Sequence, residues 1–134
     1  PAYHLINIRN YLLRTVQFSS GCPLTCEFCD IPALYGRRPR HKNPAQIIRE
    51  LDYLAAAGTP SVYFVDDNFI GDPQATRELL AHLVAWQEKW DGRVRLSCEA
   101  TLGLAKHPDI LAQMRDAFFT NVFCGIETPE PAAS

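Results

Sequence analysis

Apolar positions along this chain follow two alternating periodicities, one typical of β-strands and one typical of α-helices. Short runs rich in β-branched and aromatic residues predict four strands, at residues 13–19, 61–65, 93–99 and 121–127. Between these runs, apolar residues recur at helical spacing, which indicates amphipathic helices. Strands that alternate with helices predict βαβ units and a parallel sheet, so the expected fold class is α/β.

Capping residues mark where the predicted helices begin. Asn43 suits the N-cap position, Pro44 suits the first helical position, and Gln46 can complete a capping box. Asp72 and Pro73 open a second helix in the same way. The only long stretch without periodicity is residues 30–42, and a loop of that length in a compact domain is usually functional.

Polar and charged residues gather where the predicted strands end. Asp66, Asp67 and Asn68 follow the second strand, while Glu99 and Glu127 end the third and fourth. Three cysteines follow the first strand. Because the carboxyl ends of parallel strands meet at one rim, where sites form in such folds, all these groups are expected at one end of the molecule.

Composition indicates one globular domain with a real core. The chain has 134 residues, of which 47% are hydrophobic. We expect a lead-in segment at residues 1–12 and a core domain at residues 13–134. A net charge of −2 gives no general argument for a nucleic-acid partner, and no apolar run approaches the length of a membrane span. The missing initiator Met suggests a piece of a longer chain or a processed end.

Three of the five cysteines, Cys22, Cys26 and Cys29, fall within eight residues. Three thiolates at this spacing can bind three irons of a [4Fe–4S] cluster, which leaves the fourth iron open to another molecule. Structural zinc usually takes four ligands, and neither His4 nor His41 lies close in sequence. An odd cysteine count argues against a disulfide framework, and a cluster requires reducing conditions, so we expect the cytoplasm.

Strand alternation assigns the other two cysteines to packing. Successive side chains of a strand point to opposite faces, so Cys98 and Cys124 should face away from Glu99 and Glu127. The cysteines are then expected at helix-facing core positions. The glutamates are expected to point inward as buried carboxylates, each of which needs a partner.

The cysteine spacing, with Phe28 directly before the last cysteine, resembles the signature of the radical S-adenosylmethionine (SAM) enzymes. Further segments resemble the cobalamin-associated branch of that family, which includes hopanoid methylases. These segments are residues 16–23, 26–31, 34–37, 65–71, 98–101 and 123–129. The resemblance implies the N-terminal part of a radical SAM domain, folded as a partial (βα) barrel with about four βα units and truncated at its C-terminal side.

The resemblance also implies a chemistry. Cys22, Cys26 and Cys29 would bind a [4Fe–4S] cluster whose fourth iron chelates SAM. Reductive cleavage of SAM would yield a 5′-deoxyadenosyl radical for methylation or another C–H functionalisation. Cobalamin would be bound by a domain upstream of Pro1. The rival interpretations are a non-catalytic Fe–S module for electron transfer or sensing, and an inactive fragment of a larger enzyme.

Family likeness further implies which residues contact SAM. The backbone near Phe28 would meet adenine, although the side chain is also suited to anchoring the loop. Asp66, Asp67 and Asn68 stand where many relatives carry a Gly-Gly-Glu run that meets the methionine amino group. This chain departs from that run, and a helix-capping loop is the alternative.

The two strand-end glutamates and the basic run have alternatives of their own. For Glu99 and Glu127, hydrogen bonds to SAM are preferred over a salt bridge to an inward Arg. The basic residues within 37–42 favour a solvated loop over a nucleic-acid contact. The expected partners are a small-molecule or lipid-like substrate and an electron donor such as flavodoxin or ferredoxin.

Overall fold

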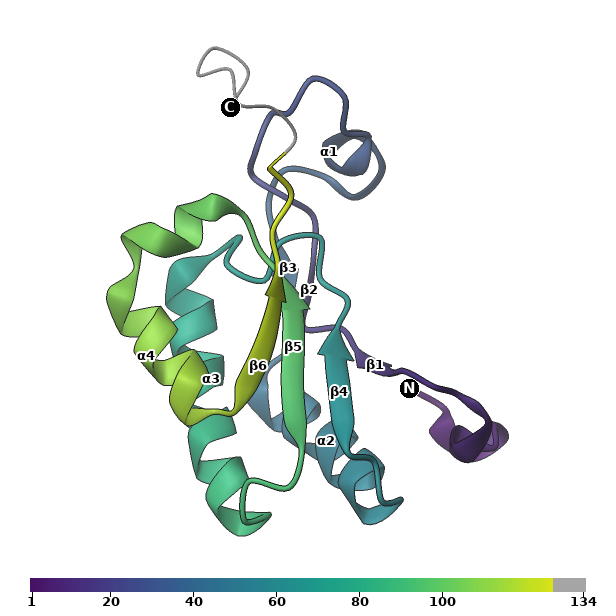
Figure 1. Ribbon diagram of the computed structural model, residues 1–134. Coiled ribbons are helices and arrows are strands. Elements are labelled where there is room, and N and C mark those ends of the chain that lie inside the picture. The colour runs from purple at the N-terminus through teal and green to yellow at the C-terminus, as the bar shows by residue number, and fades with distance from the viewer. Residues whose placement is uncertain (127–134) are drawn as a thin grey trace.

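The computed structural model describes residues 1–126. A parallel sheet with strand order β1-β4-β5-β6 forms its centre, and Figure 1 shows the helices around it. The strands of this sheet are β1 (Arg14–Val16), β4 (Ser61–Phe64), β5 (Arg95–Glu99) and β6 (Phe119–Phe123). The α-helices are α1 (Ile31–Tyr35), α2 (Pro44–Ala56), α3 (Pro73–Lys89) and α4 (Pro108–Asp116). Short 3-10 helices cover Tyr3–Leu5, Ile8–Asn10 and Leu102–Lys106.

The strand order identifies the sheet as part of a barrel. Each parallel strand lies beside the one before it in the sheet, without the reversal of order that marks a doubly wound fold. Val62, Phe64 and Leu96 alternate toward the helices and are fully buried, whereas Tyr63 and Ser97 on the other face are only half-buried. One face is therefore packed against helices. The predicted α/β fold with a partial (βα) barrel is confirmed.

The predicted helix starts are confirmed in detail. The Asn43 side chain accepts a hydrogen bond from the Gln46 backbone N–H at 2.9 Å, and the Gln46 side chain accepts one from the Asn43 N–H at 2.9 Å. Asp72 caps α3 by accepting from the N–H groups of Gln74 and Ala75. Both caps satisfy backbone donors that the first turn of a helix leaves unpaired.

The first predicted strand is wrong in its length. β1 ends at Val16, and the chain then leaves the sheet to form β2 (Ser19–Ser20), which pairs antiparallel with β3 (Arg40–His41). The Ser19 N–H donates to the Asp66 carboxylate, and the Lys42 N–H donates to the Phe18 carbonyl at 2.8 Å. These hydrogen bonds hold the backbone of Phe18 and Ser19, which no longer pairs with the parallel sheet. The 30–42 stretch consequently contains α1 and β3 rather than one irregular loop.

The fourth predicted strand is wrong in its position. β6 covers Phe119–Phe123 instead of residues 121–127. A tight turn after α4, in which the Phe118 N–H donates to the Arg115 carbonyl at 3.0 Å, starts the strand earlier. Glu127 lies outside the described residues.

The lead-in segment packs on the end of the sheet. The Tyr3 hydroxyl donates to the Thr15 carbonyl at 2.7 Å, and Ile8 is buried. The division at residues 12 and 13 stays a prediction. In the described part of the chain, none of the helices combines the length and the apolar character that a membrane crossing requires.

Candidate functional site

The cysteine loop lies at the carboxyl end of the sheet. In Figure 1, the strands β4, β5 and β6 point toward the end of the molecule that carries α1 and the segment before it. Cys22 is buried, Cys29 is half-buried and Cys26 is exposed. A turn in which the Cys29 N–H donates to the Cys26 carbonyl at 3.2 Å links the last two cysteines.

The three thiols share one loop without converging on a common point. Across residues 1–126, no group of three or more His, Cys, Asp and Glu side chains is arranged to hold a metal ion. All five cysteines are free thiols. Burial raises the pKa of the Cys22 thiol, and the nearby thiols of Cys26 and Cys29 contribute in the same direction.

The donor set fits an iron–sulfur cluster better than zinc. All three candidate ligands are thiols, the ligand type of such clusters. The His41 ring instead pairs with Asp72 at 3.8 Å and packs against Phe18 at 5.2 Å between ring centroids. His4 lines a separate pocket near the N-terminus. Neither of these two imidazoles is therefore placed to complete a zinc site with the loop cysteines.

Two acids that follow β4 turn toward the cysteine segment. Asp66 is 1% exposed, and its carboxylate accepts the Ser19 N–H. The Asp67 carboxylate accepts the Gly21 N–H at 2.9 Å. Burial raises the pKa of Asp66 to about 6, although the hydrogen bond from Ser19 acts in the opposite direction.

Asn68 and Gly71 continue the loop after β4. Asn68 is buried, and its Oδ1 accepts the Ile70 N–H at 3.3 Å. A Cβ on Gly71 would lie 3.5 Å from the Pro23 ring, so this backbone approaches the residue that follows Cys22. The loop after β4 thus packs against the segment around the first cysteine, a role that the sequence did not reveal.

Glu99 ends β5 on the sheet face opposite the helices, as predicted, but it is exposed rather than buried. Its Oε1 accepts a hydrogen bond from the Tyr63 hydroxyl at 2.8 Å, across neighbouring strands. Burial, with a smaller contribution from Glu99, raises the pKa of Tyr63 to about 12. The alternative of a salt bridge to an inward Arg is therefore not what the structure has at Glu99, whose partner is the Tyr63 hydroxyl.

The remaining sequence predictions have mixed outcomes. Cys98 is fully buried on the helix-facing side, as predicted. Cys124 lies past the end of β6 and is only half-buried, so its assignment to a strand interior is wrong. The Phe28 side chain is 68% exposed, which contradicts the loop-anchoring interpretation.

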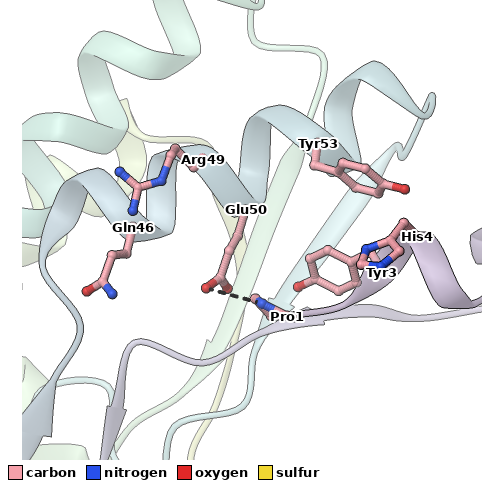
Figure 2. Close-up of a pocket in the computed structure, with 7 residues that line it drawn as sticks. All are labelled: Pro1, Tyr3, His4, Gln46, Arg49, Glu50 and Tyr53. Atoms are coloured by element: carbon pink, nitrogen blue, oxygen red, sulfur yellow. Dashed lines mark ion pairs between the residues drawn. The ribbon is translucent and has the colours of Figure 1, made fainter.

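A pocket that the sequence did not predict lies between the lead-in segment and α2 (Figure 2). It has a volume of about 360 Å³ and is lined by Pro1, Tyr3, His4, Gln46, Arg49, Glu50 and Tyr53. Tyr3 stacks on Tyr53 at 5.7 Å between ring centroids, and Glu50 accepts from Lys42 at 2.8 Å. None of the predicted site residues lines this pocket.

Comparison with known families identifies the protein family of this chain. The family model described as the radical SAM superfamily matches residues 16–133. The chain belongs to the radical SAM superfamily. Its matched region starts within β1 and includes the cysteine loop and the whole sheet from there on.

Curated relatives of this radical SAM chain include methylases. It is 58% identical to a hopanoid C-2 methylase of Rhodopseudomonas palustris, an alignment that covers 99% of this chain and 25% of the relative. It is 48% identical to an uncharacterized methyltransferase of Synechocystis, covering 97% of this chain and 24% of that protein. The chain therefore spans about a quarter of the length of these relatives.

Solved structures support the radical SAM fold. The methyltransferase TsrM from Kitasatospora setae, with cobalamin and a [4Fe–4S] cluster bound, matches with a TM-score of 0.78. The match covers 90% of this chain and 23% of that one, at 23% sequence identity. At this identity the likeness establishes the fold alone.

Proposed function

We propose that this chain is the cluster-binding part of a radical SAM enzyme that uses a [4Fe–4S] cluster and SAM to methylate its substrate. The observation that carries the proposal is the Cys22, Cys26 and Cys29 loop at the carboxyl end of β1. The identity of 58% between this chain and a named methylase supports the same proposal. Methylation is the most specific outcome supported, and another C–H functionalisation is the broader one.

The three loop cysteines are the proposed ligands of the cluster. Each contributes one thiolate to one iron, and the absence of a fourth thiol from the loop leaves one iron for SAM. When bound, the cluster supplies an electron whose transfer cleaves SAM to methionine and a 5′-deoxyadenosyl radical. The chain itself binds the cofactors, orients them and excludes water from them.

Groups at the same rim are proposed to bind SAM. The backbone beside Phe28 is assigned to adenine, and the exposed Glu99 carboxylate accepts from the donors of SAM, together with Glu127. The side chains of Asp66 and Asp67 are engaged by the cysteine segment. For the run from Asp66 to Asn68, we therefore propose that backbone carbonyls meet the methionine amino group.

The wider assembly is part of the same proposal. Cobalamin is bound by another domain of the protein, in keeping with the cobalamin in the TsrM structure. The substrate is a small or lipid-like molecule, as the hopanoid methylase relative suggests. A flavodoxin or ferredoxin supplies the electron in the cytoplasm, where thiols stay reduced.

Anaerobic reconstitution with iron and sulfide tests the cluster. We expect about four irons per chain, the number in one [4Fe–4S] cluster, and loss of the cluster in Cys22→Ala, Cys26→Ala or Cys29→Ala. Cys98→Ala is the matched control, because Cys98 is a buried core residue, and it should keep the iron. Iron loss in Cys98→Ala equal to that in Cys26→Ala would contradict the three-ligand assignment.

A second experiment tests catalysis and SAM binding. Reduction with dithionite in the presence of SAM should yield 5′-deoxyadenosine, whereas an electron-transfer module would yield none. Glu99→Gln should weaken SAM binding in calorimetry, by about 1–3 kcal/mol, since it removes a charged acceptor. Glu88→Gln on α3 is the control, and equal SAM affinity in both variants would make Glu99 a structural residue.

A further inference from the structure

We propose that Asp66 and Asp67 are positioning residues that fix the segment leading into Cys22 before any cluster is bound. The inference rests on the proposed function only in taking Cys22 as a cluster ligand. In this inference, the side chains after β4 hold the cysteine segment instead of contacting the methionine end of SAM.

The first argument is that two consecutive carboxylates reach the same segment. Asp66 accepts the Ser19 N–H, and Asp67 accepts the Gly21 N–H. These contacts join parts of the chain more than forty residues apart, and Asp66 is almost fully buried. A turn that merely capped α3 would need only Asp72.

The second argument is that the backbone at Gly21 and Cys22 is held from two sides. The Gly21 N–H is bonded to Asp67, and the Cys22 N–H donates to the Gly36 carbonyl at 3.2 Å. Gly21 has a φ of +93°, and a Cβ there would lie 2.8 Å from the same Gly36 oxygen. The N–H groups of Gly21 and Cys22 are therefore both hydrogen-bonded, and the backbone of this segment has little conformational freedom.

The third argument is the contrast among the three cysteines. Cys22 is 9% exposed and held by the β4–α3 loop, whereas Cys26 is exposed and Cys29 is half-buried. The hydrogen bond from the Cys29 N–H to Cys26 is local to the loop. Cys22 is thus the ligand already in place, and the outer two cysteines close onto the cluster around it.

This arrangement has a consequence for a bound cluster. Ordering one ligand in advance lowers the conformational entropy that binding must remove. Asp67 should therefore govern how Cys22 is held before the cluster binds.

Thiol alkylation in the cluster-free protein tests the positioning role. With iodoacetamide and peptide mass spectrometry, we expect Cys26 to react at least about tenfold faster than Cys22, because accessibility controls the rate. Asp67→Ala should abolish this protection of Cys22. Asp67→Asn, which keeps an acceptor oxygen, should restore it, and Asp116→Ala on α4 is the control for losing an exposed acid.

Cys98 is an internal reporter of folding in this experiment, because it is fully buried. If Cys98 also reacts in Asp67→Ala, that variant has unfolded, and Asp67→Leu takes its place because it removes the acceptor oxygen while keeping a similar side-chain size. Selective exposure of Cys22 supports the inference. Unchanged protection of Cys22 in a folded variant overturns it.

The contrast between Cys22 and Cys98 separates positioning from simple structural support, because a general loosening of the fold exposes both thiols and loss of the Asp67 contact exposes only Cys22. A protein that takes up no cluster refutes the proposed function, and the alkylation pattern still decides the inference.

Discussion

At the scale of single residues, the Asp66 carboxylate is notable because it is charged, buried and only partly paired. One oxygen accepts the Ser19 N–H, while Oδ2 is buried without a hydrogen-bond partner among the described residues. Burial raises its pKa from 3.8 to about 6. Between these pH values the folded state keeps a proton that the unfolded state has released. The free energy of unfolding therefore loses a contribution as pH rises through that window.

We predict that Asp66→Asn removes this pH dependence. The amide keeps an oxygen for the Ser19 N–H but carries no charge to bury. Relative to the original protein, the free energy of unfolding of Asp66→Asn should increase by about 2 kcal/mol between pH 4 and pH 7. Urea unfolding at several pH values measures the difference, with the exposed Asp116→Asn as control. Parallel pH curves for the original protein and Asp66→Asn would show that the carboxylate is not perturbed.

At the scale of elements, the start of α2 depends on a reciprocal cap. Asn43→Ala removes the acceptor of the Gln46 N–H and should lower the free energy of unfolding by about 1 kcal/mol. Asn43→Ser keeps a capping oxygen and should recover most of the loss. Urea unfolding followed by circular dichroism checks both variants. Equal stability of Asn43→Ala and Asn43→Ser would mean that the cap contributes nothing.

The contact between α2 and α3 contains a shared carboxylate. Asp52 accepts from the indole N–H groups of Trp86 and Trp90, each at 2.9 Å, and from Lys89 at 3.1 Å. Burial alone would raise the pKa of Asp52, but these hydrogen bonds outweigh it and hold the pKa below its usual value. The carboxylate is therefore ionised throughout the neutral range.

We predict that Asp52→Ala destabilises the protein by about 1–3 kcal/mol, because the indole of the buried Trp86 loses its acceptor. Asp52→Asn keeps an acceptor and should cost less. Urea unfolding followed by tryptophan fluorescence is the measurement, since both indoles report on this contact. If Asp52→Ala and the surface variant Asp116→Ala are equally stable, the shared carboxylate has no net effect.

Elements were predictable from the sequence where their signals are local. Asn43 and Gln46 lie within one helical turn of each other, and Asp72 adjoins its helix, so both helix starts could be read directly. α1 carries no side-chain cap hydrogen bond and has only five residues, so Pro32 in its first turn is a weak signal by itself. The end of β1 depends on Asp66, 47 residues away from Ser19, and no periodicity encodes such a contact.

The candidate site also has parts that were predictable from the sequence and parts that were not. The cysteines were predictable because their spacing is itself the signal, and the rim was predictable because parallel strands share a direction. The engagement of Asp66 and Asp67 by the cysteine segment was not predictable. Acidic residues after a strand are equally suited to a ligand, a helix cap or a neighbouring backbone, and only the three-dimensional contact distinguishes these roles.

At the scale of the whole molecule, the carboxyl and amino ends of the parallel strands have different roles. The carboxyl ends carry the cysteine loop and the residues that hold it, while the amino ends carry tight turns between helices and strands. One such turn places Gly92 at a φ of +62°, and a Cβ there would lie 2.5 Å from the Phe118 ring. In βα barrels, sites occupy the carboxyl ends, and features at the other end contribute to stability.

This division predicts opposite behaviour for two substitutions. Gly92→Ala forces a side chain into a left-handed backbone and against an aromatic ring, so it should lower the free energy of unfolding by at least about 1–2 kcal/mol. Its iron content after reconstitution should equal that of the original protein, because the cysteine loop is untouched. Cys26→Ala should do the reverse, since Cys26 is exposed: the cluster is lost, and the stability of the cluster-free protein hardly changes.

Urea unfolding of the cluster-free proteins and iron analysis of the reconstituted proteins give both readouts for each variant. Iron uptake is compared well below the unfolding midpoint of Gly92→Ala, so that lost folding is not mistaken for a lost site. Loss of iron in folded Gly92→Ala would show that the amino ends also shape the cysteine loop. A large loss of stability in cluster-free Cys26→Ala would show that this cysteine packs in the fold. Either result would mean that the chain does not separate its chemistry from its stability at opposite ends of the sheet.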